Sequence, residues 1–181
     1  YFCVCRLATG CSDCVLNGMG YARPPKNYHF SYKNQVSLLR STEVIDTTAI
    51  YFLHDDKNYN RSNAYIRFYA DGHFKTQATK AYPIKEEVNN HAYGIVGYYI
   101  LQENTVKMQV YTNVNGGSNQ LEFGFVDENK NLVVMHQNPR STYKIGFSER
   151  AMKRKAANRN VPPLVYEKIK IDGLTYIQPN W

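Results

Sequence analysis

The sequence has few cysteines, almost no tryptophan and no long apolar run. All four cysteines lie within the first 14 of its 181 residues, so no disulfide can form between two later residues. No stretch of ~18 apolar residues occurs, so the sequence predicts no transmembrane helix. The single tryptophan is Trp181. An apolar content of 43% in a chain of this length instead predicts one folded domain with its own core.

Short catalytic motifs are also missing. The chain has no G-x-S-x-G elbow and no glycine-rich phosphate loop, and none of its five histidines has H-E-x-x-H spacing. The sequence therefore predicts a protein that is not an enzyme and that needs no cofactor or metal. An enzyme whose site is assembled from distant residues is the third interpretation, after the two binding functions described below.

The cysteine-rich N-terminal segment has three interpretations. Residues 7–11 resemble a bacterial lipobox, in which Gly10 would precede the cleavage site and Cys11 would carry the lipid. The spacing C-x-C-x₅-C-x₂-C could instead surround a zinc ion, or the cysteines could belong to a leader or a local disulfide cluster without further chemistry. Residues 1–34, which include Pro24-Pro25, are therefore expected to be a signal remnant and a flexible tether.

Residues 35–148 have the alternation of a β-sheet protein. The 16 tyrosines and 8 phenylalanines favour strands, and apolar and polar residues alternate in short runs separated by turn residues such as Asp71-Gly72. The runs are 47–53, 64–70, 73–81, 93–102, 105–111, 121–125, 132–136 and 143–147. Strands at this spacing predict an all-β antiparallel meander of about seven or eight strands, folded as a barrel or a sandwich.

Two of these runs carry a resemblance to a known group of proteins. The segment YIRFYADGHF at 65–74, followed by GYYILQENTV at 97–106, resembles small bacterial cell-envelope lipoproteins with a lipocalin-like barrel. The resemblance implies a protein of the envelope or a secreted one, held at the membrane by a lipid rather than by a spanning helix. It implies a small hydrophobic ligand or another envelope protein as partner.

The alternation also predicts which side chains face the interior. One set of alternate positions is apolar throughout, and we expect the following members of it to contact a ligand: Ile66, Phe68, Met108, Phe123, Phe125 and Tyr143. Because this set carries no charge, the expected ligand is apolar. Arg67 lies on the opposite face between Tyr65 and Tyr69, so we expect it on the outer surface.

The chain from residue 149 to 181 is predicted to form a basic helix over 149–159, followed by a hairpin or tail. Residues 149–170 hold seven lysines and arginines against two glutamates, whereas the preceding part is nearly balanced. The helix offers an alternative function, binding an anionic surface or a nucleic acid. The residues predicted to bind the anion are Arg150, Lys153, Arg154 and Lys155. Its lack of aromatic residues argues against nucleic acid, because single strands need stacking side chains.

Overall fold

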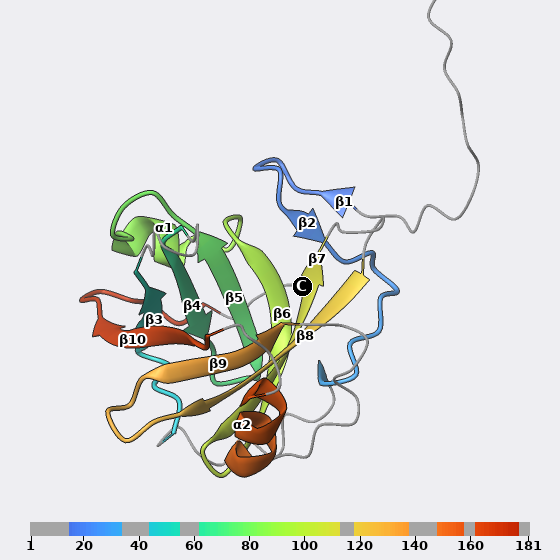
Figure 1. Ribbon diagram of the computed structural model, residues 1–181. Coiled ribbons are helices and arrows are strands. Elements are labelled where there is room, and N and C mark those ends of the chain that lie inside the picture. Colours follow the sequence, from blue (N-terminus) through green and yellow to red (C-terminus); the bar gives the residue numbers. More distant parts are fainter. Residues whose placement is uncertain are drawn as a thin grey trace, which may run out of the picture.

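Eight antiparallel strands close into one barrel in the computed structural model (Figure 1). The structure describes residues 15–33, 44–54, 62–112, 118–137, 148–157 and 162–177. The barrel strands are β3 (Ala49–Leu53), β4 (Ala64–Phe68), β5 (His73–Ala78), β6 (Ile95–Gln102), β7 (Thr105–Thr112), β8 (Ser118–Val126), β9 (Leu132–Gln137) and β10 (Leu164–Lys170). The all-β antiparallel prediction is confirmed, and the closed barrel is compatible with a lipocalin-like architecture.

The strand that closes the ring comes from the C-terminal part of the chain. Strands β3 to β9 pair in sequence order, and β10 pairs with both β9 and β3. The strand predicted over 143–147 lies outside the described residues. Sequence spacing did not indicate this closure, because β10 and β3 are more than 100 residues apart in the chain.

Tight turns join the strands at one end of the barrel, where the predicted turn residues are found. Gly72 takes a φ of 87°, and its N–H donates to the carbonyl of Tyr69 at 3.1 Å. Glu103, with φ 52°, and Lys130, with φ 65°, hold the same left-handed conformation in the β6–β7 and β8–β9 turns. These three turns draw the strand ends together, and we call this end of the barrel the closed end.

Large side chains fill the interior toward the closed end. The main buried cluster draws members from every barrel strand, which is possible only on the inside of a closed barrel. It includes Tyr51, Phe68, Phe74, Tyr99, Met108 and Leu132. The rings of Phe68 and Tyr99 are 4.7 Å apart, and the Tyr99 hydroxyl donates to the carbonyl of Tyr69 at 2.8 Å. Gly97 sits in this packing so closely that an added Cβ would lie 2.1 Å from the backbone oxygen of Gln109.

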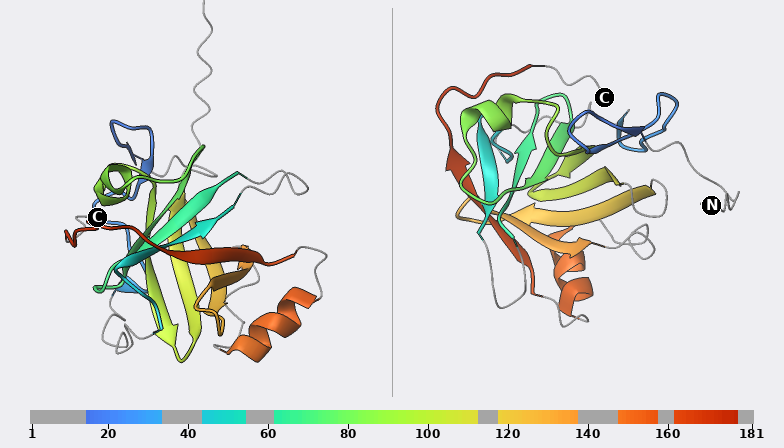
Figure 2. Two further views of the ribbon diagram at one scale, coloured as in Figure 1. Left: turned by 90° about the vertical axis from the view of Figure 1, so that its left-hand side faces the viewer. Right: turned by 90° about the horizontal axis from the view of Figure 1, so that it is seen from above.

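The outside of the barrel is covered in three places (Figure 2). A short helix, α1 (Lys85–Asn89), and the chain from Ile171 to Ile177 lie over the outer face around β3 and β4, where Phe52, Tyr65 and Val88 are buried together. Helix α2 (Glu149–Ala157) lies on β8 and β9. Ser148 caps it, because its Oγ accepts from the N–H of Ala151 at 3.3 Å.

The third cover is the N-terminal segment, which the sequence predicts to be a flexible tether. Strands β1 (Val15–Leu16) and β2 (Ala22–Arg23) form a small hairpin of their own. The chain after them then packs on the outer face of β6 and β7, where Phe30 is only 2% exposed and lies 4.8 Å from the ring of Tyr98. Its aromatic residues hold this segment against the barrel.

Candidate functional site

The end of the barrel opposite the tight turns contains a cavity of about 410 Å³. Residues at interior-facing positions of the strands form most of its wall, and Tyr21 and Gln77 line the remainder. The described lining residues are Tyr21, Ala64, Thr76, Gln77, Ala78, Ile95, Val110, Thr112, Gln120, Glu122 and Tyr166. A volume of this size falls within the range of roughly 300–1,000 Å³ that is usual for small-molecule sites.

The cavity exists because the interior side chains change size along the barrel axis. Toward the closed end the interior positions of β4 and β5 hold Phe68 and Phe74, which face each other across the pair. Toward the open end the corresponding pairs are Ile66 with Thr76, and Ala64 with Ala78. An eight-stranded barrel is just wide enough for its side chains to fill it, so small residues at these positions leave space.

One carboxylate faces this cavity, contrary to the prediction of an uncharged interior. Glu122 pairs with Met108 across β7 and β8, and Met108 belongs to the interior cluster, so Glu122 points inward too. It is 7% exposed. The hydroxyl-bearing Thr112 and the amide of Gln120 share the same wall. The interior can therefore offer a carboxyl group and other hydrogen-bonding groups to a ligand as well as apolar surface.

The same register corrects two predicted ligand residues. Phe123 and Phe125 alternate with Glu122, so both side chains point out of the barrel instead of lining it. Phe123 is buried with Met152 of α2, and Lys153 lies 4.9 Å over the ring of Phe125. The prediction failed because α2 covers the outer face of β8, and a covered outer face carries apolar residues just as an interior face does.

The other predicted ligand residues have different placements. Ile66, Phe68 and Met108 face the interior as expected, but they belong to its packed cluster and do not line the cavity. Tyr143 lies outside the described residues. The predicted interior face is therefore correct for β4 and β7. The cavity, however, lies nearer the open end of the barrel than Ile66, Phe68 and Met108 do.

Arg67 lies on the outer face of the barrel, as predicted, but it is buried rather than on the surface. Its side chain is 2% exposed, because α1 and the C-terminal segment cover it. The guanidinium donates to the carbonyl oxygens of Val88 and Thr175 and to Oδ1 of Asn89. Burial lowers the pKa of Arg67. The hydrogen bonds that its guanidinium donates fix both α1 and the C-terminal segment to β4.

A second buried cation stands beside Arg67 under the same cover. Lys75 of β5 is fully buried, and its Nζ donates to the carbonyls of Glu87 and Asn90 at 3.0 and 2.8 Å. Burial, together with the positive charges of Arg67 and Arg23, lowers the pKa of Lys75 to about 7. The sequence did not indicate this residue, because a single lysine in an alternating strand is normally expected to be exposed. Both cations bind carbonyls at the C-terminal end of α1, where helix carbonyls lack partners within the helix.

Three of the four predicted anion-binding cations of α2 have described side chains, and all three are exposed. Arg150 and Arg154 are exposed, whereas Lys153 forms an ion pair with Glu149 one turn earlier. The structure does not describe the side chain of Lys155. Anion binding by α2 stays a prediction, and the pairing of Lys153 weakens it.

A metal centre is not found among the described residues. Among these residues no three histidine, cysteine, aspartate or glutamate side chains are placed to hold a metal ion. The four cysteines fall outside them, so the interpretations of Cys11 and its neighbours stay predictions. No helix within the described ranges is both long and apolar enough to cross a membrane.

Comparison of the chain with family models, with curated proteins and with solved structures found no match.

Proposed function

We propose that the protein is a binding module that takes up a small molecule in the open end of its barrel. The observation that carries this proposal is the cavity of about 410 Å³ with Glu122 in its wall. Apolar surface from Ile95, Val110 and Tyr166 would contact the body of the ligand, and each methylene that it buries contributes about 0.8 kcal/mol. The protein is proposed to act by binding rather than by catalysis, in the cell envelope or outside the cell.

The carboxylate narrows the class of ligand. A carboxylate in the cavity wall can accept hydrogen bonds, so it favours a ligand that brings a positive charge or hydrogen-bond donors over one that brings a second acid. A fatty acid would instead place a second negative charge near Glu122. We therefore propose a small amphipathic amine or alcohol, rather than the wholly apolar ligand that the sequence predicts.

Displacement of a neutral apolar dye tests the proposal. N-phenyl-1-naphthylamine is titrated into the protein and then displaced by octylamine, octanol and octanoate, which share one chain length. We expect saturable dye binding and displacement in the order octylamine, octanol, octanoate. Glu122→Gln should remove the preference for octylamine over octanol while leaving dye binding intact.

Two further variants separate the site from the rest of the surface. Ala78→Trp at the exposed rim should block dye binding without disturbing the core, because Ala78 already borders solvent. Glu128→Gln, an exposed glutamate in the turn at the closed end, should change nothing. Dye binding that survives Ala78→Trp, or an amine preference that survives Glu122→Gln, would overturn the proposal.

A further inference from the structure

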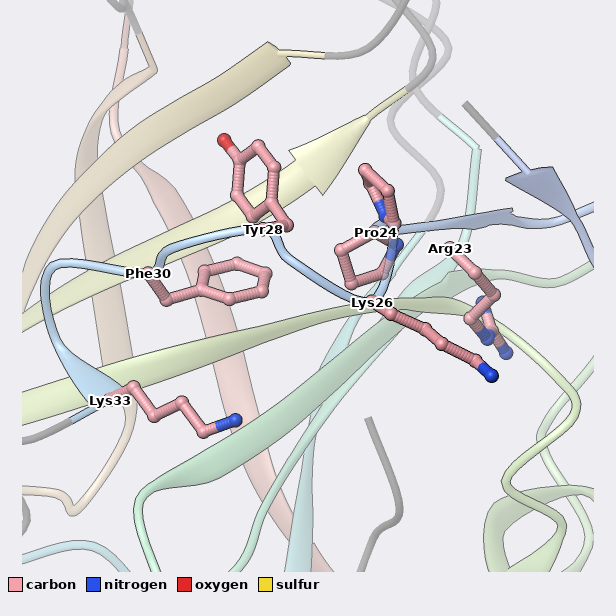
Figure 3. A pocket seen from close by; sticks show the side chains of 7 residues that line it. Arg23, Pro24, Lys26, Tyr28, Phe30 and Lys33 are labelled. Atoms are coloured by element: carbon pink, nitrogen blue, oxygen red, sulfur yellow. The ribbon is translucent and has the colours of Figure 1, made fainter. Parts of the chain in front are cut away.

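A second cavity, of about 440 Å³, lies on the outside of the barrel where the N-terminal segment crosses β6 and β7. Its described lining comes wholly from that segment: Arg23, Pro24, Pro25, Lys26, Tyr28, Phe30 and Lys33. Figure 3 shows the segment arching over this space, with Lys33 below Phe30 and with Lys26 extending away from Phe30 toward the side of Arg23. None of these residues lines the cavity inside the barrel.

The charge of this outer cavity is of one sign. Three cations line it, and its described lining contains no aspartate or glutamate. The ammonium group of Lys26 is exposed and makes no hydrogen bond or ion pair with any residue in the described ranges. Lys33 is also exposed, and its Nζ lies 5.8 Å from the centre of the Tyr98 ring. Two uncompensated ammonium groups beside one concave surface make a site for an anion.

Arg23 supplies a third positive charge that cannot move away. Its guanidinium donates to the carbonyls of Ala22, His91, Ala92 and Gly94 at 2.9–3.0 Å. These bonds tie the arch to the loop before β6. Because all its partners are neutral carbonyls, the charge of Arg23 still adds to the field in the cavity.

The arch is held in shape before any ligand arrives. Phe30 is buried against Tyr98, and the rings of Tyr28 and Tyr111 are 4.7 Å apart. Turns at both ends of the arch are hydrogen-bonded, since the N–H of Tyr28 donates to the Pro25 carbonyl and that of Lys33 to the Phe30 carbonyl. Half-exposed Pro24, Pro25 and Tyr28 add an apolar wall beside the cations. A ligand that combines an anion with a flat ring would match both parts.

We infer that this outer cavity binds an organic phosphate, with the phosphate beside the cations that line the cavity and a flat ring against the proline and tyrosine wall. Phosphate carries up to two negative charges and several acceptor oxygens, so it can accept hydrogen bonds from an ammonium group while the other cations of the cavity add to the attraction. A soluble phosphate ester and a phospholipid headgroup share this chemistry. The walled shape of the cavity favours the soluble ester.

Calorimetric titration of the full chain with phenyl phosphate tests the inference, with phenol and inorganic phosphate as probes of the two halves of the ligand. We expect one saturable site for phenyl phosphate, binding at least tenfold weaker for inorganic phosphate, and none for phenol. The double variant Lys26→Gln/Lys33→Gln should weaken phenyl phosphate binding at least tenfold. Lys80→Gln, which also removes an exposed lysine charge, should leave it unchanged.

Four results would overturn the inference. The first is phenol binding as tight as that of phenyl phosphate, and the second is a double variant that binds like the wild type. The third is binding of vesicles of phosphatidylcholine with phosphatidylglycerol through Lys26 and Lys33 without binding of phenyl phosphate, which would assign the cations to a membrane surface. The fourth is loss of phenyl phosphate binding in Ala78→Trp, which would move the site into the barrel.

Discussion

The buried amine of Lys75 should make the stability of the protein depend on pH in an unusual direction. Its pKa is about 7 in the folded protein, against an ordinary value of 10.5 that applies to the unfolded chain. Between these two values the unfolded chain holds one proton more than the folded protein. Stability therefore rises with pH over this range, and below pH 7 the group is charged in both states and contributes no further slope.

The magnitude follows from the size of the shift. Each pKa unit corresponds to about 1.4 kcal/mol, so the window from pH 7 to 9.5 should add about 3 kcal/mol to the free energy of unfolding. Above pH 10 the trend reverses, because burial raises the pKa of Tyr51, Tyr69 and Tyr98 to about 12. The folded protein then resists ionisation that the unfolded chain undergoes. The greatest stability is expected between about pH 9 and 10.

Urea denaturation followed by circular dichroism at half-unit steps from pH 6 to 10.5 measures this dependence. Lys75→Met keeps an unbranched chain of similar length and removes the titrating group, so most of the rise in stability between pH 7 and 9.5 should disappear. Lys80→Met, at an exposed position of the same region, should keep the wild-type slope. A flat wild-type curve, or an equal rise in Lys75→Met, would refute this account of the buried amine.

Three further predictions concern other parts of the chain. Gly97→Ala should lower the free energy of unfolding, measured by urea denaturation, by about 3 kcal/mol, because the added Cβ would meet the backbone of β7. Gly18→Ala should leave urea denaturation unchanged, because its added Cβ meets nothing within 4 Å. Any binding of single-stranded nucleic acid by the wild type should weaken with salt, with a slope of about −0.7 in log K against log salt for each phosphate contact. Changing Lys153, Arg154 and Lys155 together to alanine should abolish this binding in a filter assay. Nanomolar binding that survives ~0.3 M salt would instead make nucleic acid the principal partner. Mass spectrometry of the native protein should find a lipidated Cys11 at the N-terminus, and an unmodified chain that still carries Cys3 would contradict export by this route.

The sequence predicted the architecture well because strand alternation and turn chemistry are local properties. Asp71-Gly72 forms its hairpin, and the alternation of 105–111 gives β7 its interior face. The face of β8 could not be assigned in the same way. Leu121, Phe123 and Phe125 are apolar because α2 covers them, and only the pairing of Glu122 with Met108 shows which side is the interior.

The candidate site was harder to predict than the fold. The space inside the barrel results from small residues, among them Ala64, Thr76 and Ala78, that meet only once the strands are aligned. The cover over Arg67 and Lys75 comes from a five-residue helix and the C-terminal segment, distant in the chain from each other. A small-residue pattern at alternate positions near strand ends was the one signal that could have located the cavity.

Methyl-resolved NMR of the full chain during titration with octylamine tests the central claim most directly. The account predicts saturable shifts, with one common dissociation constant, for the methyl groups of Ile95 and Val110, which line the cavity. The methyl groups of Val15 and Leu16, in the hairpin outside the barrel, should not move. Unchanged Ile95 and Val110 signals at saturating octylamine, octanol and octanoate would show that the open end of the barrel takes up no such ligand, and would contradict the proposed function.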